Sequence, residues 1–171
     1  NGLLAQHRNE SPQNQIAYSL ALMQKSHDAV AGVNSLVEVA RKCGYTKELC
    51  AHILRHTMST DILGKHPEVQ KMKRIVAAQG TLVSNFSISE GVYKAIPKGV
   101  ELDPDNAFFP LMSAILILSS NEYRYVAESE AESNRLAAYV ALERAAKCSY
   151  YEDYMWQEAA LVQNLYERTF G

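Results

Sequence analysis

The chain has 171 residues, of which 47% are hydrophobic and 21% are charged. This composition argues against an intrinsically disordered chain or a fibrous repeat, and the length fits one domain with a single core. Eight glycines and five prolines favour long, uninterrupted helices, because these two residues punctuate β-rich and loop-rich chains.

The formal net charge of −2 conceals an uneven distribution along the chain. Residues 1–98 carry 12 Lys and Arg against 7 Asp and Glu, a net charge of +5, whereas residues 99–171 carry 5 against 12, a net charge of −7. The two halves can therefore attract each other within one molecule or between copies. The positive charge is dilute compared with the basic face that phosphate binding requires, which makes nucleic acid a less favoured partner than protein.

Residues 12–43 are predicted to form one long helix. Ser11 and Pro12 suit its first turn, since serine caps free amides and proline needs no amide hydrogen there. Apolar residues then recur every three or four positions as far as Val37. A break at Gly32 is the alternative, because glycine lowers helix stability.

The next helix is predicted over residues 47–60, with Thr46 as its cap. Its leucines and isoleucine fall on one side, which we expect to be buried in the core. Glu48, His52 and Arg55 fall on the opposite side, which we expect to face solvent.

The middle of the chain has the least regular sequence pattern. We predict a helix over residues 67–79, an extended piece or helical turn over 81–88, and a short helix over 89–96 that ends before Pro97. Residues 97–106 contain prolines, a glycine and charges and are predicted to form a loop. The charge balance of the chain also changes at this loop.

Three helices are predicted in the C-terminal part, over residues 107–126, 128–147 and 150–169. The start of the last helix is set by Ser149 and Glu152, whose spacing matches a capping box. The longest apolar run of the chain lies in the first of these helices. It is too short to span a bilayer, so we expect a buried core helix and no membrane span.

These elements predict an all-α protein, an irregular bundle of about six or seven helices that forms a single domain over residues 1–171. The alternative is a subdivision into two helical subdomains joined near 97–106. The first would be a basic helical half over 11–96, and the second an acidic, aromatic-rich helical half over 107–171.

The distribution of aromatic residues indicates a protein-interaction surface. Seven of the ten tyrosines and the only tryptophan lie in the last third of the chain. Tyrosine and tryptophan bury a large area while keeping a polar group, which is typical of binding surfaces. We predict a non-enzymatic adaptor module that binds a protein partner or its own copies and needs no cofactor. The residues predicted to bind the partner are Tyr151, Tyr154, Trp156 and Glu158.

A DNA-binding regulator is the first alternative. Residues 36–58 have the layout of a helix-turn-helix, with a glycine in the turn and apolar residues after it. The segment VARKCGYT resembles the turn of AraC-class regulators, and this resemblance implies that the following helix enters a DNA groove. The side chains offered to the groove would be Lys47, Glu48, Ala51, His52 and Arg55.

A metal-dependent helical enzyme is the second alternative. His52 and His56 lie four residues apart, a spacing at which one helix presents two imidazoles to one ion. A third ligand would have to come from elsewhere, and no residue lies at a diagnostic spacing. This alternative therefore depends on the tertiary structure.

The three cysteines, Cys43, Cys50 and Cys148, form no CxxC pair. Free thiols in a reducing compartment are the favoured interpretation, and they favour a cytoplasmic location. The alternative is a disulfide between Cys43 and Cys50 in an exported protein. Export stays open as an interpretation because the sequence begins at Asn1 rather than Met, which is compatible with a removed signal segment.

Overall fold

The computed structural model describes residues 11–26, 29–57, 90–123 and 128–170. All regular elements in these residues are helices, seven in number, which confirms the all-α prediction. The predicted elements at 67–79 and 81–88 lie outside the described residues. The helices are α2 (Pro12–Ser26), α3 (Ala29–Cys43), α4 (Lys47–Thr57), α7 (Glu90–Leu102), α8 (Phe108–Tyr123), α9 (Glu128–Lys147) and α10 (Met155–Phe170).

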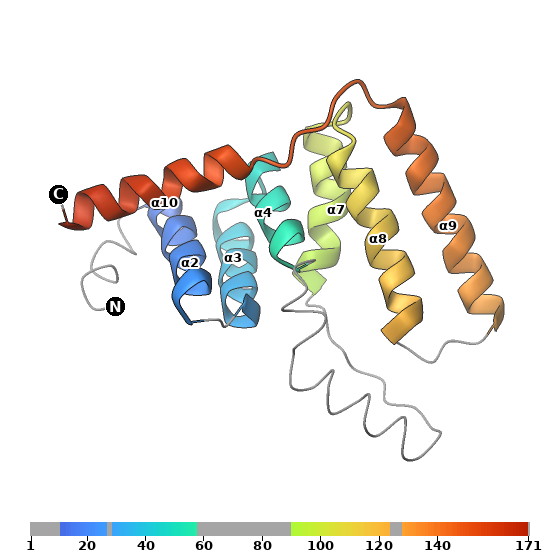
Figure 1. Cartoon of the computed structure of the whole chain (residues 1–171), viewed down its shortest axis with the longest axis horizontal. Coiled ribbons are helices and arrows are strands. Elements are labelled where there is room, and N and C mark those ends of the chain that lie inside the picture. Colours follow the sequence, from blue (N-terminus) through green and yellow to red (C-terminus); the bar gives the residue numbers. More distant parts are fainter. Residues whose placement is uncertain (1–10, 27–28, 58–89, 124–127, 171) are drawn as a thin grey trace, which may run out of the picture.

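The first six of these helices lie side by side in chain order, as a row that runs from α2 to α9 (Figure 1). Each helix of the row packs against the helix before it and the helix after it. The last helix, α10, returns across one end of the row and packs against α2 and α4. The row is therefore covered by α10 on its N-terminal side, whereas α9 forms its opposite edge.

One contiguous hydrophobic core runs through the row. Among its most deeply buried members are Leu20 of α2, Leu36 of α3, Ile53 of α4 and Phe109 of α8. Of the residues that the structure describes, α9 contributes none to this core, and its own buried residues are both alanines. The helix α9 is thus attached to α8 through small side chains instead of being anchored in the centre.

The prediction of one long helix over residues 12–43 is wrong. α2 ends at Ser26, α3 begins at Ala29, and the two helices pack against each other. As a pair they bury their apolar stripes on each other, whereas one straight helix would leave much of a stripe exposed. The predicted break position, Gly32, lies inside α3 against the side chain of Met23, where the missing Cβ lets the two helices approach closely.

Residues 97–102 were predicted as part of a loop but belong to α7. This helix continues through Pro97, although proline offers no amide hydrogen to the helix and so removes one hydrogen bond. The side chain of Pro97 is exposed, whereas Ala95 and Gly99 on either side are buried. Packing on both sides of the proline therefore holds the helix together.

The capping box at Ser149 and Glu152 is also a wrong prediction, since α10 begins at Met155. The Glu152 carboxylate accepts a hydrogen bond from the amide of Tyr154 at 2.8 Å, and the Ser149 amide donates to the carbonyl of Asp105 at 3.1 Å. Asp153 instead accepts from the amide of Met155 at 3.0 Å at the true start of the helix. Tertiary bonds of the connection thus displace the local cap.

The apolar run that opens α8 is buried in its first part, as expected, whereas Ile115 and Leu118 further along it are exposed. Phe108 and Phe109 meet edge to face with ring centroids 5.3 Å apart, and both are almost completely inaccessible to solvent. Among the helices that the structure describes, none combines the length and the apolar character that a bilayer crossing needs.

Replacing Gly99 by alanine is expected to destabilise the fold by about 1–3 kcal/mol. A Cβ at this position would overlap the ring of the fully buried Phe109, which has no free space to enter. Urea unfolding of the Gly99→Ala variant measures the effect. The control is Asn164→Ala at an exposed position of α10, which should change the stability by less than about 0.5 kcal/mol. Equal losses in the two variants would refute this account of the packing between α7 and α8.

Candidate functional site

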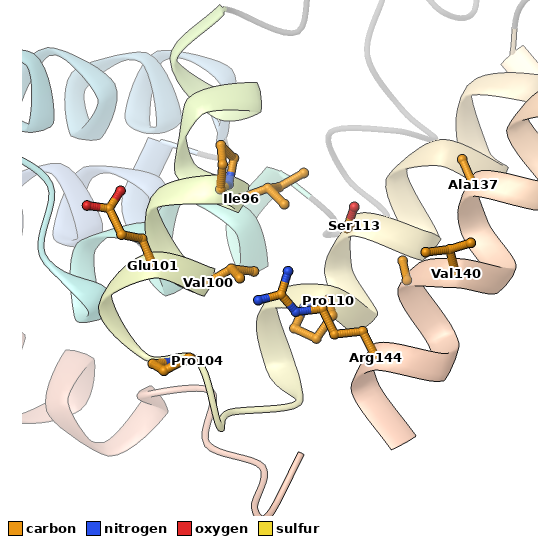
Figure 2. A pocket seen from close by; sticks show the side chains of 11 residues that line it. Ile96, Val100, Glu101, Pro104, Pro110, Ser113, Ala137, Val140 and Arg144 are labelled. Atoms are coloured by element: carbon orange, nitrogen blue, oxygen red, sulfur yellow. The ribbon is translucent and has the colours of Figure 1, made fainter. Parts of the chain in front are cut away.

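An open groove of about 650 Å³ lies between α7, α8 and α9 (Figure 2). Ile96 and Val100 form the α7 wall, Pro110 and Ser113 of α8 form the floor, and α9 forms the other wall. Most of the lining is apolar. The charged residues of this lining are Glu101 on α7 and Arg144 on α9.

The groove stays open because the residues that line it are short or rigid. Ser113, Ala137 and Ala141 are too small to fill the space between the helices. Pro110 lies in the first turn of α8, where the missing amide hydrogen costs no helical hydrogen bond. Pro97 also lines the groove, on the exposed side of α7.

Three large apolar side chains of α9 are exposed beside the groove. Leu136, Tyr139 and Val140 are 66%, 67% and 60% exposed, and their spacing places them on one stripe of the helix. Ala131 and Ala138 face the opposite side, against α8. Since Val140 also lines the groove, the stripe and the groove form one continuous surface, which we call the α9 surface.

The two ends of α9 differ in charge, although Arg135 pairs with Glu128 near the acidic end and Glu143 lies beside Arg144 near the basic end. Glu128 and Glu130 lie in the first turn, with Glu132 just after it, whereas Arg144 and Lys147 lie in the last turn. This order is favourable for the helix dipole, which attracts negative charge to the N-terminus and positive charge to the C-terminus.

A second group of polar residues joins α10 to α4, and Glu158 lies at its centre. The Glu158 carboxylate forms an ion pair with Arg55 and lies 2.9 Å from Nε2 of His56. Nδ1 of His52 is 3.3 Å from the same carboxylate. Arg55 also donates a hydrogen bond of 2.9 Å to the carbonyl of Asp153. We call these five residues the α4–α10 cluster.

Both histidines of the α4–α10 cluster are neutral at pH 7. Burial, followed by the Arg55 guanidinium, lowers the pKa of His52 to about 4, against the opposing effect of the Glu48 and Asp153 carboxylates. Burial likewise lowers the pKa of His56 to about 4, with Arg55 and His52 acting in the same direction. Nε2 of His52 is buried with no hydrogen-bond partner in the structure.

The proposed metal site at His52 and His56 gains no third ligand in the structure. In the described part of the chain, no group of three or more His, Cys, Asp or Glu side chains is placed to hold a metal ion. The carboxylate of Glu158 and the imidazole of His52 instead contact the guanidinium of Arg55, and His56 contacts the same carboxylate. An arginine cation thus lies among the groups that the metal hypothesis assigned to an ion.

The predicted outward face of α4 is wrong. His52 and Ala51 are fully buried, and Arg55 is engaged with α10. Of the residues assigned to a DNA groove, Lys47 and Glu48 are half-buried, and Nζ of Lys47 lies 5.6 Å from the ring centroid of Tyr154. The cause is α10, which lies about a hundred residues further along the chain and covers the polar side of α4.

The predicted partner-binding residues divide into two exposed and two buried side chains. Tyr151, in the connection before α10, and Trp156, in the first turn of α10, are exposed. Tyr154 and Glu158 are buried and bound to other parts of the same chain. The residues of the α9 surface were not singled out from the sequence, although the apolar triplet Leu136, Tyr139 and Val140 in an otherwise polar helix was a readable signal.

Tyr154 belongs to a hydrogen-bonded network that fixes the connection between α9 and α10. Asp103 accepts hydrogen bonds from the hydroxyls of Tyr150 and Tyr154 and from Nδ2 of Asn106, the last at 3.1 Å. Burial alone would raise the pKa of Asp103, but these three hydrogen bonds together lower it. Tyr154 itself has a left-handed backbone with φ of 60°.

Asn106 is the fully buried centre of this network. Its Oδ1 accepts from the amides of Phe108 and Glu152, each at 3.0 Å, and its Nδ2 donates to the carbonyl of Glu152 at 2.8 Å. One side chain therefore caps α8 and ties down the connection to α10. The network holds both ends of the segment 148–154, so α9 is joined to a fixed point at its C-terminus.

All three cysteines are free thiols, so the Cys43–Cys50 disulfide is not formed. Burial raises the pKa of Cys50 to about 12, which keeps this thiol protonated and unreactive.

No protein-family description matches the chain, and comparisons with curated proteins and with solved structures find no significant match.

Proposed function

We propose that the chain is a non-enzymatic helical protein-interaction module and that the α9 surface is its contact surface. The observation that carries the proposal is the exposure of Leu136, Tyr139 and Val140 next to an apolar groove. Contiguous apolar patches on a soluble domain mark binding sites, because leaving them in water costs free energy that a partner recovers.

The shape of the α9 surface suits a helix of a partner protein. A groove walled by two helices and floored by a third accepts the apolar side of an amphipathic helix, with side chains entering at every third or fourth position. The charged residues Glu101 and Arg144 lie among apolar lining residues, where they can select the register of the bound segment. Figure 2 shows Arg144 extending from α9 toward α7.

The polar groups of the described residues support binding over catalysis. Neutral imidazoles beside a carboxylate resemble a general acid–base group, yet His52 is fully buried and Glu158 is bound to Arg55. Asp103 is bound to two tyrosines and an asparagine. Both groups connect helices of the fold instead of facing the groove.

Site-specific photo-crosslinking tests the proposal. Ala137 lines the groove and is exposed, so a benzoylphenylalanine introduced there is expected to form a covalent adduct with a protein in cells of the source organism. The control position is Asn164, an exposed residue of α10, a helix that contributes no residue to the lining of the groove. Absence of adducts from position 137 above the level at position 164 would reject the α9 surface as an interaction site.

A further inference from the structure

We propose that α10 is an acid-sensitive latch, which detaches from α4 in mildly acidic solution while the row from α2 to α9 stays folded. This inference goes beyond the proposed function, since it concerns the contact of α10 with α4 and not the α9 surface. It rests on the groups that α10 encloses, on the way α10 is held, and on the point at which the chain can bend.

The docked α10 separates the polar side of α4 from water. His52 is fully buried, and its Nδ1 lies 3.3 Å from the carboxylate of Glu158. Nε2 of His56 lies 2.9 Å from the same carboxylate, which also pairs with Arg55. Two imidazoles and a guanidinium of α4 therefore meet one carboxylate of α10. Release of α10 returns this side of α4 to water.

A proton added to His52 is poorly accommodated while α10 is docked. A charged imidazole has two N–H donors. Nδ1 of His52 faces Glu158, but Nε2 is buried with no hydrogen-bond partner. An unpaired donor of a buried cation is costly, because the charge loses its hydration and gains no acceptor in exchange. Hydration of the ring removes this cost, so protonation favours the released state of α10.

The charges around the imidazoles do not compensate for their burial. Protonation of both rings places three cations, the third being Arg55, against one buried carboxylate, that of Glu158. Glu48 of α4 and Asp153 of the connection also attract a protonated His52, and both are partly exposed. Burial outweighs these attractions, since the pKa of each imidazole is lowered to about 4 in the docked chain.

α10 adds little to the apolar core of the row. Its buried residues are Glu158, Val162 and Leu165, and of these three only Val162 belongs to the main core. Leu165 packs with Ala17 of α2 in a small separate cluster. The opposite side of α4 stays in the main core through residues such as Ile53. Detachment of α10 therefore leaves the core of the row in place, as expected for a local opening.

The chain is fixed immediately before α10, which gives the latch a hinge. The side chain of Asn106 donates to the carbonyl of Glu152 and accepts from its amide, and Asp103 accepts from the hydroxyl of Tyr154. These bonds tie the connection 148–154 to the segment between α7 and α8, and none of them involves a side chain of α10. They persist when α10 swings away, so α9 is not released with it.

Hydrogen exchange measured by mass spectrometry at pH 7 and pH 5 tests the latch. The measured quantity is the protection factor, the ratio of the intrinsic to the observed exchange rate. From pH 7 to pH 5 the protection of the α10 amides is expected to decrease at least about tenfold, because the released state binds protons that the docked state excludes. At pH 5 the amides of α8 should be better protected than those of α10, since they exchange only when the row unfolds.

The variant His52→Gln carries a side chain that does not titrate, so its α10 amides should lose less protection between pH 7 and pH 5 than those of the wild type. The control is Glu167→Gln, which removes a charge from an exposed residue of α10 and should keep the wild-type dependence on pH. Circular dichroism confirms that each variant folds, and His56→Gln replaces His52→Gln if the latter does not fold.

Equal protection of α10 and α8 at pH 5 overturns the latch, because α10 would then detach only when the whole chain unfolds. Protection of α10 that is the same at pH 7 and pH 5 overturns the control by acid. A histidine variant with the full wild-type dependence on pH overturns the assignment of the switch to the imidazoles.

Discussion

Replacing Arg55 by methionine is expected to lower the free energy of unfolding by about 3 kcal/mol. The substitution keeps the length of the side chain but removes the cation, so the Glu158 carboxylate stays buried without its ion-pair partner. It also removes the hydrogen bond to the carbonyl of Asp153. The loss is measured by urea denaturation at pH 7.

A double-mutant cycle shows whether the loss comes from the pair. The double variant Arg55→Met with Glu158→Leu should be more stable than the sum of the single losses implies, because it leaves no uncompensated charge. The matched control is Arg41→Met, which breaks an ion pair of 3.4 Å to Glu38 between two exposed side chains and should change stability by less than about 1 kcal/mol. Additive losses at Arg55 and Glu158 would show that they act independently.

The second large expected effect is a loss of stability between pH 6.5 and pH 4. In the unfolded chain His52 and His56 have the ordinary pKa of 6.5, whereas in the folded chain burial lowers both pKa values to about 4. The unfolded chain therefore binds more protons in this window, and the free energy of unfolding decreases as the pH falls. Above about pH 6.5 the titration of the histidines does not lower the free energy of unfolding. At pH 4 it has lowered the free energy of unfolding by about 3 kcal/mol per histidine.

Urea unfolding at half-unit intervals from pH 7.5 to pH 4.5 measures this dependence. The groups that face the imidazoles are Arg55 and Glu48 of α4 together with Asp153 and Glu158 of the C-terminal segment. In the variant His56→Gln, a titrating side chain is replaced by one that does not titrate. The free energy of unfolding should therefore decrease less steeply as the pH is lowered. The pKa of Asp103 is lower in the folded chain than its ordinary value of 3.8. The stability that Asp103 contributes is therefore lost only as the pH falls below about 3.8, which is outside this window. A stability that stays constant from pH 7 to pH 5 would contradict neutral, buried imidazoles.

The helices were predictable from local sequence where their apolar periodicity and their end signals agree. The start of α4 at Lys47 matches the prediction because Thr46 caps the helix. The ends of α9 at Glu128 and Lys147 also match, and its acidic first turn and basic last turn suit the helix dipole. The start of α10 was missed because the local Ser149 and Glu152 pattern competes with hydrogen bonds to Asp105 and Asn106, more than forty residues earlier.

The orientation of α4 could not be predicted, for a similar reason. Amphipathic periodicity assigns one buried side to a helix, and His52 falls on the other side by that rule. The helix is nevertheless buried on both sides, because Glu158 of α10 provides a charged partner for Arg55 and His56. The sequence separation of these partners leaves no local pattern, and the same holds for the groove, which requires α7, α8 and α9 to be placed together.

The return of α10 to α2 determines the order in which the fold can be completed. The contacts within the row join each described helix to the next one along the chain, across at most 32 intervening residues, so they can form progressively as the chain is synthesised. The contacts of α10 with α2 join segments more than one hundred residues apart, and they have to wait until the whole row has emerged. Until then, Arg55 and the two imidazoles of α4 face water, and the late docking of one helix converts them from hydrated surface groups into interior ones.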